Sequence, residues 1–208
     1  MHKSILNKEQ IQILDLISKE KYVTENFYLG GGTALAEFYL HHRLSEDLDF
    51  FSENEVDVMA ISTFFQKIKN VAGIKEVSVE QSFNRNLFLL TLEKVNIKTE
   101  FTYYPFERVE KGKKIGGLNV DSLMDIAVNK VFTIYQKPRS RDFIDLYCIL
   151  KSNKNINLDN LIKFAQIKFG HFIDPLQIAA QFSKAEAVTD YPTLLIDLEK
   201  TEWVNFYL

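Results

Sequence analysis

Two aspartates, Asp47 and Asp49, are the residues whose types and spacing most directly suggest chemistry. They lie in the segment "EDLDFF", where polar and apolar residues alternate as they do along a β-strand. Alternate residues of a strand point to the same face of a sheet, so the two carboxylates project together. An isolated Asp-x-Asp is often only part of a solvated strand, but a buried pair of like charges needs a compensating cation. Because Mg²⁺ is held by carboxylates together with phosphate oxygens, the pair predicts a metal ion that binds a phosphate-containing substrate.

A glycine-rich turn precedes the aspartates and offers a place for that phosphate. Gly31 and Gly32 separate a predicted strand, "NFYL", from a predicted helix over residues 33–42. Glycine allows a sharp turn and a close approach to a ligand, and a helix start presents unpaired N–H groups and a positive dipole end. Thr33 adds a hydroxyl donor there, so we expect Gly31, Gly32 and Thr33 to hold a triphosphate. The alternative, a tight turn with Thr33 as helix N-cap, explains the glycines but not the carboxylates.

Three more side chains are candidates for the same site. Ser45 shares the strand parity of the two aspartates, so its hydroxyl can reach the same place. Arg43 pairs with a carboxylate or steadies the loop, and the alternative is an ordinary surface salt bridge. A two-metal phosphoryl site generally uses a third carboxylate, and we expect Glu100 in "NIKTEFTYY" to supply it. Glu100 lies opposite the apolar face of that predicted strand, and the alternative is a solvent-facing residue of an edge strand.

The elements that must position these residues are a mixed set of helices and strands, followed by helices alone. The first part predicts helices at residues 8–21, 33–42 and 57–71 and strands at residues 26–29, 46–51, 74–83, 86–93 and 95–104. Short turns join the last three strands, which favours an antiparallel meander. Residues 111–117 are predicted as a polar loop, and helices follow at residues 121–136, 141–152, 158–169, 174–182 and 191–206. The sequence therefore predicts an α+β fold with a catalytic core at residues 1–117 and a helical C-terminal region at residues 118–208.

The composition is that of an ordinary globular protein. The 208 residues include 46% hydrophobic and 25% charged residues, and the net charge is −3. This charge gives no overall electrostatic footprint for nucleic acid, so an RNA partner needs a local basic patch. The one cysteine, Cys148, excludes an internal disulfide and a cysteine-based zinc site, and its apolar surroundings predict a buried structural thiol. No signal-peptide pattern and no apolar run of membrane-spanning length is present, which predicts a cytoplasmic protein without a membrane partner.

The segment "GGTALAEFYLHHRLSEDLDFFS" resembles the first motif of the AbiEii/AbiGii-type nucleotidyltransferases, which belong to the DNA polymerase β-like nucleotidyltransferase superfamily. That motif is Gly-Gly-Thr-Ala-Leu, an apolar helix, and then Arg-x-Ser-x-Asp-x-Asp followed by an apolar residue. The residues that fit it are Gly31, Gly32, Thr33, Ala34, Leu35, Arg43, Ser45, Asp47, Asp49 and Phe50. A second family motif, a helical Lys and then Arg-Asp-x-x-Asp-Leu after a basic turn, is matched by Lys130, Arg141, Asp142 and Asp145.

The resemblance implies a small mixed sheet flanked by helices, and an enzyme that transfers a nucleotidyl group from an NTP to an acceptor with two Mg²⁺ ions. The implied catalytic residues, whose carboxylates also bind the metal, are Asp47, Asp49, Glu100 and Lys130. Lys130 would reach the phosphates, although a Lys on an apolar helix usually extends to solvent. Asp142 and Asp145 share a helix face and either contribute to nucleotide binding or clamp the helical region onto the core. Arg141 is expected to pair with Asp145 along the helix.

The acceptor and the biological role are open. Many relatives are toxins of toxin–antitoxin or abortive-infection systems, and some resemble enzymes that modify tRNA ends. RNA such as tRNA is therefore the favoured acceptor, and a cognate antitoxin is an expected partner. Two basic turns, at residues 111–114 and 137–141, either grip RNA or are simply solvated. The alternatives are a small-molecule or protein acceptor, and a catalytically inactive module that binds a nucleotide or a partner.

Overall fold

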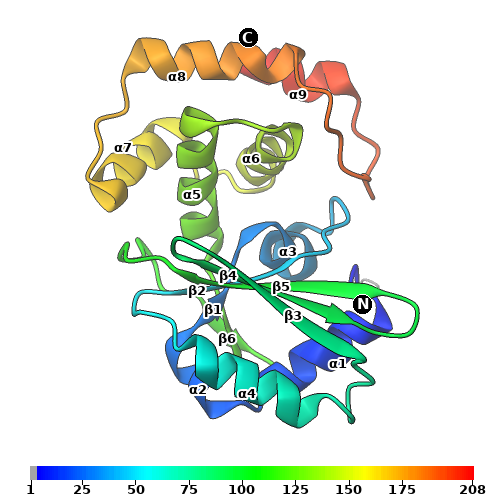
Figure 1. Ribbon diagram of the computed structural model, residues 1–208. Coiled ribbons are helices and arrows are strands. Elements are labelled where there is room, and N and C mark those ends of the chain that lie inside the picture. The colour runs from blue at the N-terminus through cyan, green and yellow to red at the C-terminus, as the bar shows by residue number, and fades with distance from the viewer. Residues whose placement is uncertain (1–3) are drawn as a thin grey trace.

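The protein folds into a mixed β-sheet with helices on both faces and a helical C-terminal part, which confirms the predicted fold (Figure 1). The computed structural model describes residues 4–208, so the first three residues of the predicted catalytic core lie outside the described chain. The strands are β1 (Tyr28–Leu29), β2 (Leu48–Ser52), β3 (Glu76–Ser82), β4 (Arg85–Thr91), β5 (Asn96–Tyr103), β6 (Lys113–Ile115) and β7 (Leu118–Val120). The helices are α1 (Lys8–Ile17), α2 (Lys21–Asn26), α3 (Gly31–Leu35), α4 (Val58–Ile68), α5 (Leu123–Gln136), α6 (Ser140–Ser152), α7 (Leu158–Phe169), α8 (Pro175–Phe182) and α9 (Lys200–Tyr207).

The strands form one sheet in the order β3-β4-β5-β2-β1-β7-β6. Strands β3, β4 and β5 are the predicted antiparallel meander. Strand β5 then runs parallel to β2, and this register places Glu100 beside Asp49. Strand β1 pairs antiparallel with β2 and parallel with β7. Strand β2, which carries Asp49, therefore lies inside the sheet with a paired neighbour on each side.

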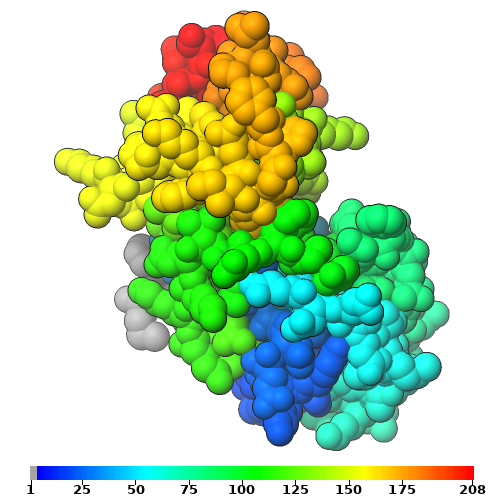
Figure 2. All heavy atoms as spheres, turned by 90° about the vertical axis from the view of Figure 1, so that its left-hand side faces the viewer, coloured from blue at the N-terminus to red at the C-terminus, as the bar shows by residue number. Residues whose placement is uncertain are grey.

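Two helical layers enclose the sheet. Helices α1, α2 and α4 cover one face, while α3 and α5 lie on the other, with α6 to α9 farther from the sheet (Figure 1). Helix α5 contacts α3 on the sheet side and α6, α7 and α8 in the C-terminal part. Figure 2 shows the C-terminal helices stacked on the sheet part, with a narrower outline where the two parts meet. Helix α5 is thus the main element that joins the two parts.

Local sequence explains most helix boundaries. Asn7 and Gln10 form a capping box, in which Asn7 Oδ1 accepts from the Gln10 backbone N–H at 2.7 Å, and α1 begins there as predicted. The predicted first helix is interrupted after Ile17, and its end belongs to the separate helix α2. The helix predicted over residues 33–42 begins earlier, with α3, and continues as a π-helix over Ala36–Leu40. It stops where His41 takes the left-handed conformation, with φ 51°.

Two other sequence predictions were wrong in part. Residues 111–117 are not only a loop, because β6 and a turn at Gly116 and Gly117, both with positive φ, lie within them. Strand β7 follows and pairs with buried β1, so tertiary contacts override a polar local sequence here. The sheet thus extends just past residue 117, and the division into residues 1–117 and 118–208 stays a prediction. The last helix is also shorter than predicted, since residues 191–199 precede it and Leu194 instead forms an isolated β-bridge with Arg43.

Aromatic side chains dominate the core under the meander. Phe50 and Phe101, on neighbouring strands, stack with ring centroids 5.0 Å apart, and Phe65 of α4 and Phe88 pack around them. All four are at most 1% exposed. Cys148 is buried in α6, as the sequence predicts. Within residues 4–208, no helix has the length and apolar character needed to cross a bilayer.

Candidate active site

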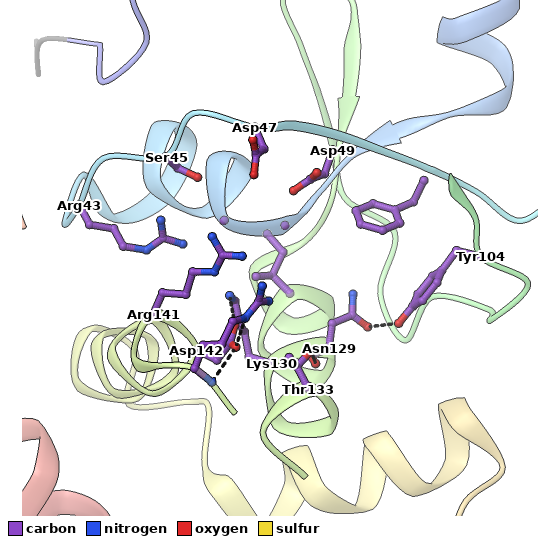
Figure 3. Close-up of a pocket in the computed structure, with 15 residues that line it drawn as sticks. Arg43, Ser45, Asp47, Asp49, Tyr104, Asn129, Lys130, Thr133, Arg141 and Asp142 are labelled. Atoms are coloured by element: carbon purple, nitrogen blue, oxygen red, sulfur yellow. Dashed lines mark hydrogen bonds and ion pairs between the residues drawn. The ribbon is translucent and has the colours of Figure 1, made fainter. Parts of the chain in front are cut away.

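A cavity of about 240 Å³ lies between the sheet and helices α5 and α6 (Figure 3). It is lined by the glycine turn, by β2 and the loop before it, by α5, and by the start of α6. The predicted site residues that line it are Gly31, Gly32, Arg43, Ser45, Asp47, Asp49, Lys130 and Asp142. Thr33, Glu100 and Asp145 lie outside this cavity, and each contacts residues that line it.

The two aspartates point into the cavity from the sheet side (Figure 3). Along β2, buried and half-buried residues alternate, so Leu48 and Phe50 enter the core while Asp49 faces the cavity. The pKa of Asp49 is raised to about 6, because the carboxylate is buried and lies near Glu100 and Asp47. Lys130 and Arg141 oppose this shift but do not cancel it. The site therefore carries excess negative charge on the sheet side.

The glycines allow the turn to approach two functional side chains. Gly31 has φ 67°, and a Cβ atom there would lie 2.7 Å from Asp49 Oδ2. A Cβ atom on Gly32 would overlap the guanidinium of Arg43. The glycine turn is therefore required by the packing of Asp49 and Arg43, whether or not it also holds phosphate.

Thr33 and Ser45 connect this turn to β2. Thr33 is fully buried, and its hydroxyl donates to the Asp47 carbonyl at 2.5 Å and lies 2.8 Å from the hydroxyl of Ser45. This bond fixes the backbone just before Asp49. Thr33 thus holds the aspartate loop against the turn, and Ser45 is the hydroxyl that faces the cavity.

Glu100 lies in a second cavity, of about 380 Å³, which shares Asp47 and Asp49 with the first. Its carboxylate accepts hydrogen bonds from Arg85 Nε at 2.7 Å, from Arg85 Nη2 at 2.6 Å and from the Thr102 hydroxyl at 2.7 Å. Burial acts to raise the pKa of Glu100, but the bonds from Arg85 and Thr102 outweigh it and the pKa is lowered. Glu100 is therefore an ionised carboxylate held by an arginine.

Asp47 and Asp49 fit a divalent cation. They share a cavity with cationic groups on its far side, and the pKa of Asp49 is raised first by burial and then by the neighbouring carboxylates, a combination that a bound cation would relieve. Glu100 is a neighbour by strand register but is turned to Arg85. Accordingly, no three His, Cys, Asp or Glu side chains within residues 4–208 are grouped so that they could hold a metal ion. The two aspartates are the part of the predicted ligand set that is arranged for metal.

A buried ion cluster joins the two parts of the protein behind the cavity. Asp145 is fully buried and accepts from Arg43 Nε at 2.6 Å and Arg43 Nη2 at 2.8 Å, while its carboxylate lies 2.7 Å from His42 Nε2 and 2.6 Å from Lys130 Nζ. Burial acts to raise the pKa of Asp145, but Lys130, Arg43 and His42 hold it well below its usual range. Asp145 thus links α6 to α5 and to the loop before β2, as the clamp alternative predicts.

The two cations predicted from the second motif behave differently. Lys130 does not extend to solvent, because its Nζ lies 2.8 Å from Asp142 and 2.6 Å from Asp145 (Figure 3). Arg141 was expected to pair with Asp145, but the buried cations already occupy both oxygens of that carboxylate. Arg141 instead points into the cavity toward the aspartates and makes no hydrogen bond or ion pair with any described residue (Figure 3). It is the guanidinium most available to a ligand.

Sequence reasoning missed several residues of the cavity wall. Phe51 and Tyr104 lie with ring centroids 5.3 Å apart, and the Tyr104 hydroxyl lies 3.5 Å from Asn129 Oδ1. Asn129 and Thr133, one turn apart on α5, face the cavity beside Lys130 (Figure 3). Phe51 was detectable, since it shares the strand parity of Asp47 and Asp49. Tyr104 was detectable in the same way, since it shares the parity of Glu100 in the strand predicted over residues 95–104.

Asp49 on an inner strand and Asp47 directly before that strand face cationic side chains across the cavity, an arrangement suited to the transfer of a phosphate-linked group. The family described as "Nucleotidyl transferase AbiEii toxin, Type IV TA system" matches residues 16–203. The chain belongs to this nucleotidyltransferase family.

The chain is also similar to individual proteins in sequence or in structure. An uncharacterized protein of Aquifex aeolicus (strain VF5) is 32% identical over 166 residues, which cover 79% of this chain and 76% of that protein. The crystal structure of a proposed nucleotidyltransferase from H. pylori superposes with a TM-score of 0.65 at 18% identity, over 97% of this chain and 92% of that one. The crystal structure of JHP933 from Helicobacter pylori gives a TM-score of 0.60 at 18% identity, over 96% and 87% of the two chains. At such identities these two structures share the fold.

Proposed function

We propose that the protein transfers a nucleotidyl group from an NTP to an RNA acceptor such as tRNA, with Mg²⁺, as the toxin of a toxin–antitoxin system. The observation that carries the proposal is the pair Asp47 and Asp49 facing Arg141 across one cavity, with a pKa for Asp49 of about 6. In this arrangement the carboxylates on one side can bind a metal ion, and the guanidinium on the other side can bind phosphate. Phosphoryl-type transfer depends on such positioning and charge stabilisation.

The nucleotide would lie in the cavity between the glycine turn and α6. Arg141 would bind its phosphates, and Lys130 would add positive charge from behind while Asp142 and Asp145 hold it in place. An acceptor hydroxyl oxygen then forms a bond to the α-phosphorus as the bond from that phosphorus to the pyrophosphate oxygen breaks. Mg²⁺ bound to Asp47 and Asp49 would neutralise charge on the phosphate oxygens during the transfer. The hydroxyl proton leaves to solvent or to a nearby carboxylate.

The acceptor would approach through the second cavity, on the side of Asp49 away from α5. This cavity is lined by the third carboxylate, Glu100, and by four cationic side chains, Arg85, Lys98, Arg139 and Arg141. The lowered pKa of Glu100 makes it a weak base, and a metal ligand is therefore the better role for it. A cavity beside several cations suits a polynucleotide end better than a small enclosed acceptor. A small-molecule or protein acceptor is the second candidate.

The family supports the proposed biological role. A toxin of this kind would act in the cytoplasm, where tRNA and NTPs are found, and a cognate antitoxin would be its partner. Residues 1–117 and 118–208 would divide the work, because the sheet part carries the aspartates and the helical part carries Arg141 and Lys130.

The test is a transfer assay with the purified protein, Mg²⁺, each of the four α-labelled NTPs, and total tRNA. We expect label on the RNA with at least one NTP, dependence on Mg²⁺, and loss of transfer in Asp49→Asn. Transfer that persists in Asp49→Asn overturns the assignment of the site. Label that appears on a protein or small molecule and never on RNA overturns the RNA acceptor in favour of the second candidate.

A further inference from the structure

Arg85 binds Glu100, the third carboxylate that was expected at the metal site. Arg85 begins β4, and β4 pairs with β5 so that Arg85 lies opposite Thr102 and two residue pairs away from Glu100. Its guanidinium grips both oxygens of Glu100, at 2.7 and 2.6 Å. Such a two-point, charge-assisted pair fixes the direction of the carboxylate as well as its charge. Glu100 is beside Asp49 in strand register, yet its oxygens are committed to Arg85.

The two partners of this pair differ in their freedom to move. The side chain of Arg85 is 67% exposed, whereas that of Glu100 is 14% exposed. Arg85 can therefore leave toward solvent by rotation of its side chain, while Glu100 stays between the strands. An ion pair with so exposed a member contributes little to stability, so a competing anion can displace it at low cost. The pair is suited to exchange.

The position of Arg85 indicates which anion would compete. Arg85, Lys98 and Glu100 line the same cavity as Asp47 and Asp49, so an acceptor that reaches the aspartates through this cavity lies beside the guanidinium. Guanidinium groups bind phosphate and carboxylate in the same two-point geometry. A phosphate of the acceptor strand could therefore replace the Glu100 carboxylate as the partner of the Arg85 guanidinium.

The turn before Arg85 favours a polynucleotide. Phe83, in the two-residue turn between β3 and β4, has φ 54° and a side chain that is 99% exposed. A large aromatic residue in the left-handed region costs stability, and its burial does not compensate for it here. Exposed aromatic rings beside cationic groups serve as stacking surfaces for single-stranded nucleic acid.

We propose that Arg85 is a positioning residue that holds Glu100 away from the metal site until a phosphate of the acceptor polynucleotide takes its guanidinium. Glu100 is then free to turn toward Asp49 and complete the carboxylate set. The inference rests on the proposed function, because it assumes a metal at Asp47 and Asp49 and a nucleic-acid acceptor. It predicts that acceptor binding and metal binding strengthen one another, by the same factor in both directions.

The experiment measures Mn²⁺ binding to the NTP-free protein by calorimetry, with and without a short single-stranded oligoribonucleotide. In the wild type, we expect the oligoribonucleotide to tighten Mn²⁺ binding about tenfold, within the usual range of such couplings. Arg85→Ala should bind Mn²⁺ about tenfold more tightly without the oligoribonucleotide, and most of the coupling should vanish. Phe83→Ala should weaken oligoribonucleotide binding and leave Mn²⁺ binding in its absence unchanged.

Three variants separate the exchange of Glu100 from a general effect of charge. Arg85→Lys keeps the charge but loses the two-point grip, so it should resemble Arg85→Ala. Lys75→Ala removes an exposed cation at the other end of the same strands, and it should resemble the wild type. In the background of Glu100→Gln, Arg85→Ala should no longer tighten Mn²⁺ binding, since the carboxylate it would release is absent.

The outcomes distinguish this inference from the proposed function beneath it. If Arg85→Ala leaves Mn²⁺ affinity unchanged, or tightens it equally in the Glu100→Gln background, the inference is overturned. If the wild type binds Mn²⁺ and Asp49→Asn does not, the metal site of the proposed function stands even then. If the wild type and Asp49→Asn bind Mn²⁺ equally, the metal site itself is refuted and the inference falls with it.

Discussion

Replacing Asp49 with asparagine should stabilise the metal-free protein, although it removes a residue of the site. Burial and the neighbouring Glu100 and Asp47 raise the pKa of Asp49 from 3.8 to about 6. The ionised carboxylate is thus less favourable in the folded chain than in the unfolded chain, by about 1.4 kcal/mol per pKa unit. The full shift corresponds to about 3 kcal/mol above pH 7. Because Asp49 keeps some contact with solvent, we expect a gain of about 2 kcal/mol for Asp49→Asn.

The direction of the pH dependence follows from the sign of the shift. With a raised pKa, the folded state binds more protons than the unfolded state between about pH 4 and pH 6, so Asp49 makes stability fall as pH rises through this window. The variant Asp49→Asn does not lose stability in this way, because asparagine does not titrate. The advantage of the variant over the wild type should therefore grow by about 1 kcal/mol between pH 5 and pH 7.5.

Urea unfolding with a chelator present, at pH 5 and pH 7.5, measures both quantities. Asp159→Asn is the matched control, because it removes an exposed carboxylate at the start of α7, outside the cavity, and should change stability by at most about 0.5 kcal/mol. A variant Asp49→Asn no more stable than the wild type at pH 7.5 would refute the reasoning. Added Mg²⁺ should reverse the order by stabilising only the wild type, since a ligand of the folded state adds to its stability.

Three further substitutions test the division between cavity and clamp. Arg141→Ala should weaken NTP binding about tenfold to a hundredfold by calorimetry and change the unfolding free energy little, because Arg141 has no ion-pair partner among the described residues. Lys130→Ala should destabilise the protein by about 3–5 kcal/mol in urea unfolding, because it leaves Asp142 and Asp145 buried with less compensation; a loss under 1 kcal/mol contradicts the clamp. Thr33→Val should cost about 1–3 kcal/mol by the same measurement, since the Asp47 carbonyl loses its donor, while an unchanged midpoint would show that this bond does not hold the loop.

The sequence was sufficient for the parts of the site that lie on one strand or one turn. The parity of Asp47 and Asp49 predicts their common direction, which the structure shows although the strand predicted from residue 46 begins only at Leu48 and Asp47 directly precedes it. The meander could be predicted for the same reason, since its strands are consecutive and joined by short turns. The parallel pairing of β2 with β5 could only be guessed, although it is what places Glu100 beside Asp49.

The contacts of the charged residues could not be predicted, because each depends on which of several partners lies closest in space. Asp145 has Arg141 one helical turn away in sequence, yet it is paired with Arg43 from a distant loop. The spacing along the helix favours a pair between Arg141 and Asp145. Because the Asp145 carboxylate is buried, it pairs instead with cations that are buried beside it. Glu100 likewise lies opposite Leu87 in the register and is nevertheless held by Arg85, a diagonal neighbour whose long side chain reaches it.

The aspartates of the two motifs thus have opposite effects on the stability of the folded protein. The ionised form of Asp49 is destabilised by burial and by the carboxylates of Glu100 and Asp47, which favours a cation in the cavity. Asp145 is stabilised by the cations Arg43 and Lys130 and by a hydrogen bond with His42, and it links the loop before β2 to α5 and α6. A cavity with unrelieved charge can persist in a folded protein only if nearby structure holds its walls in place. The buried cluster around Asp145 supplies that support. Loss of the cluster should therefore lower the stability of the protein, and catalysis should fall as a consequence of that instability.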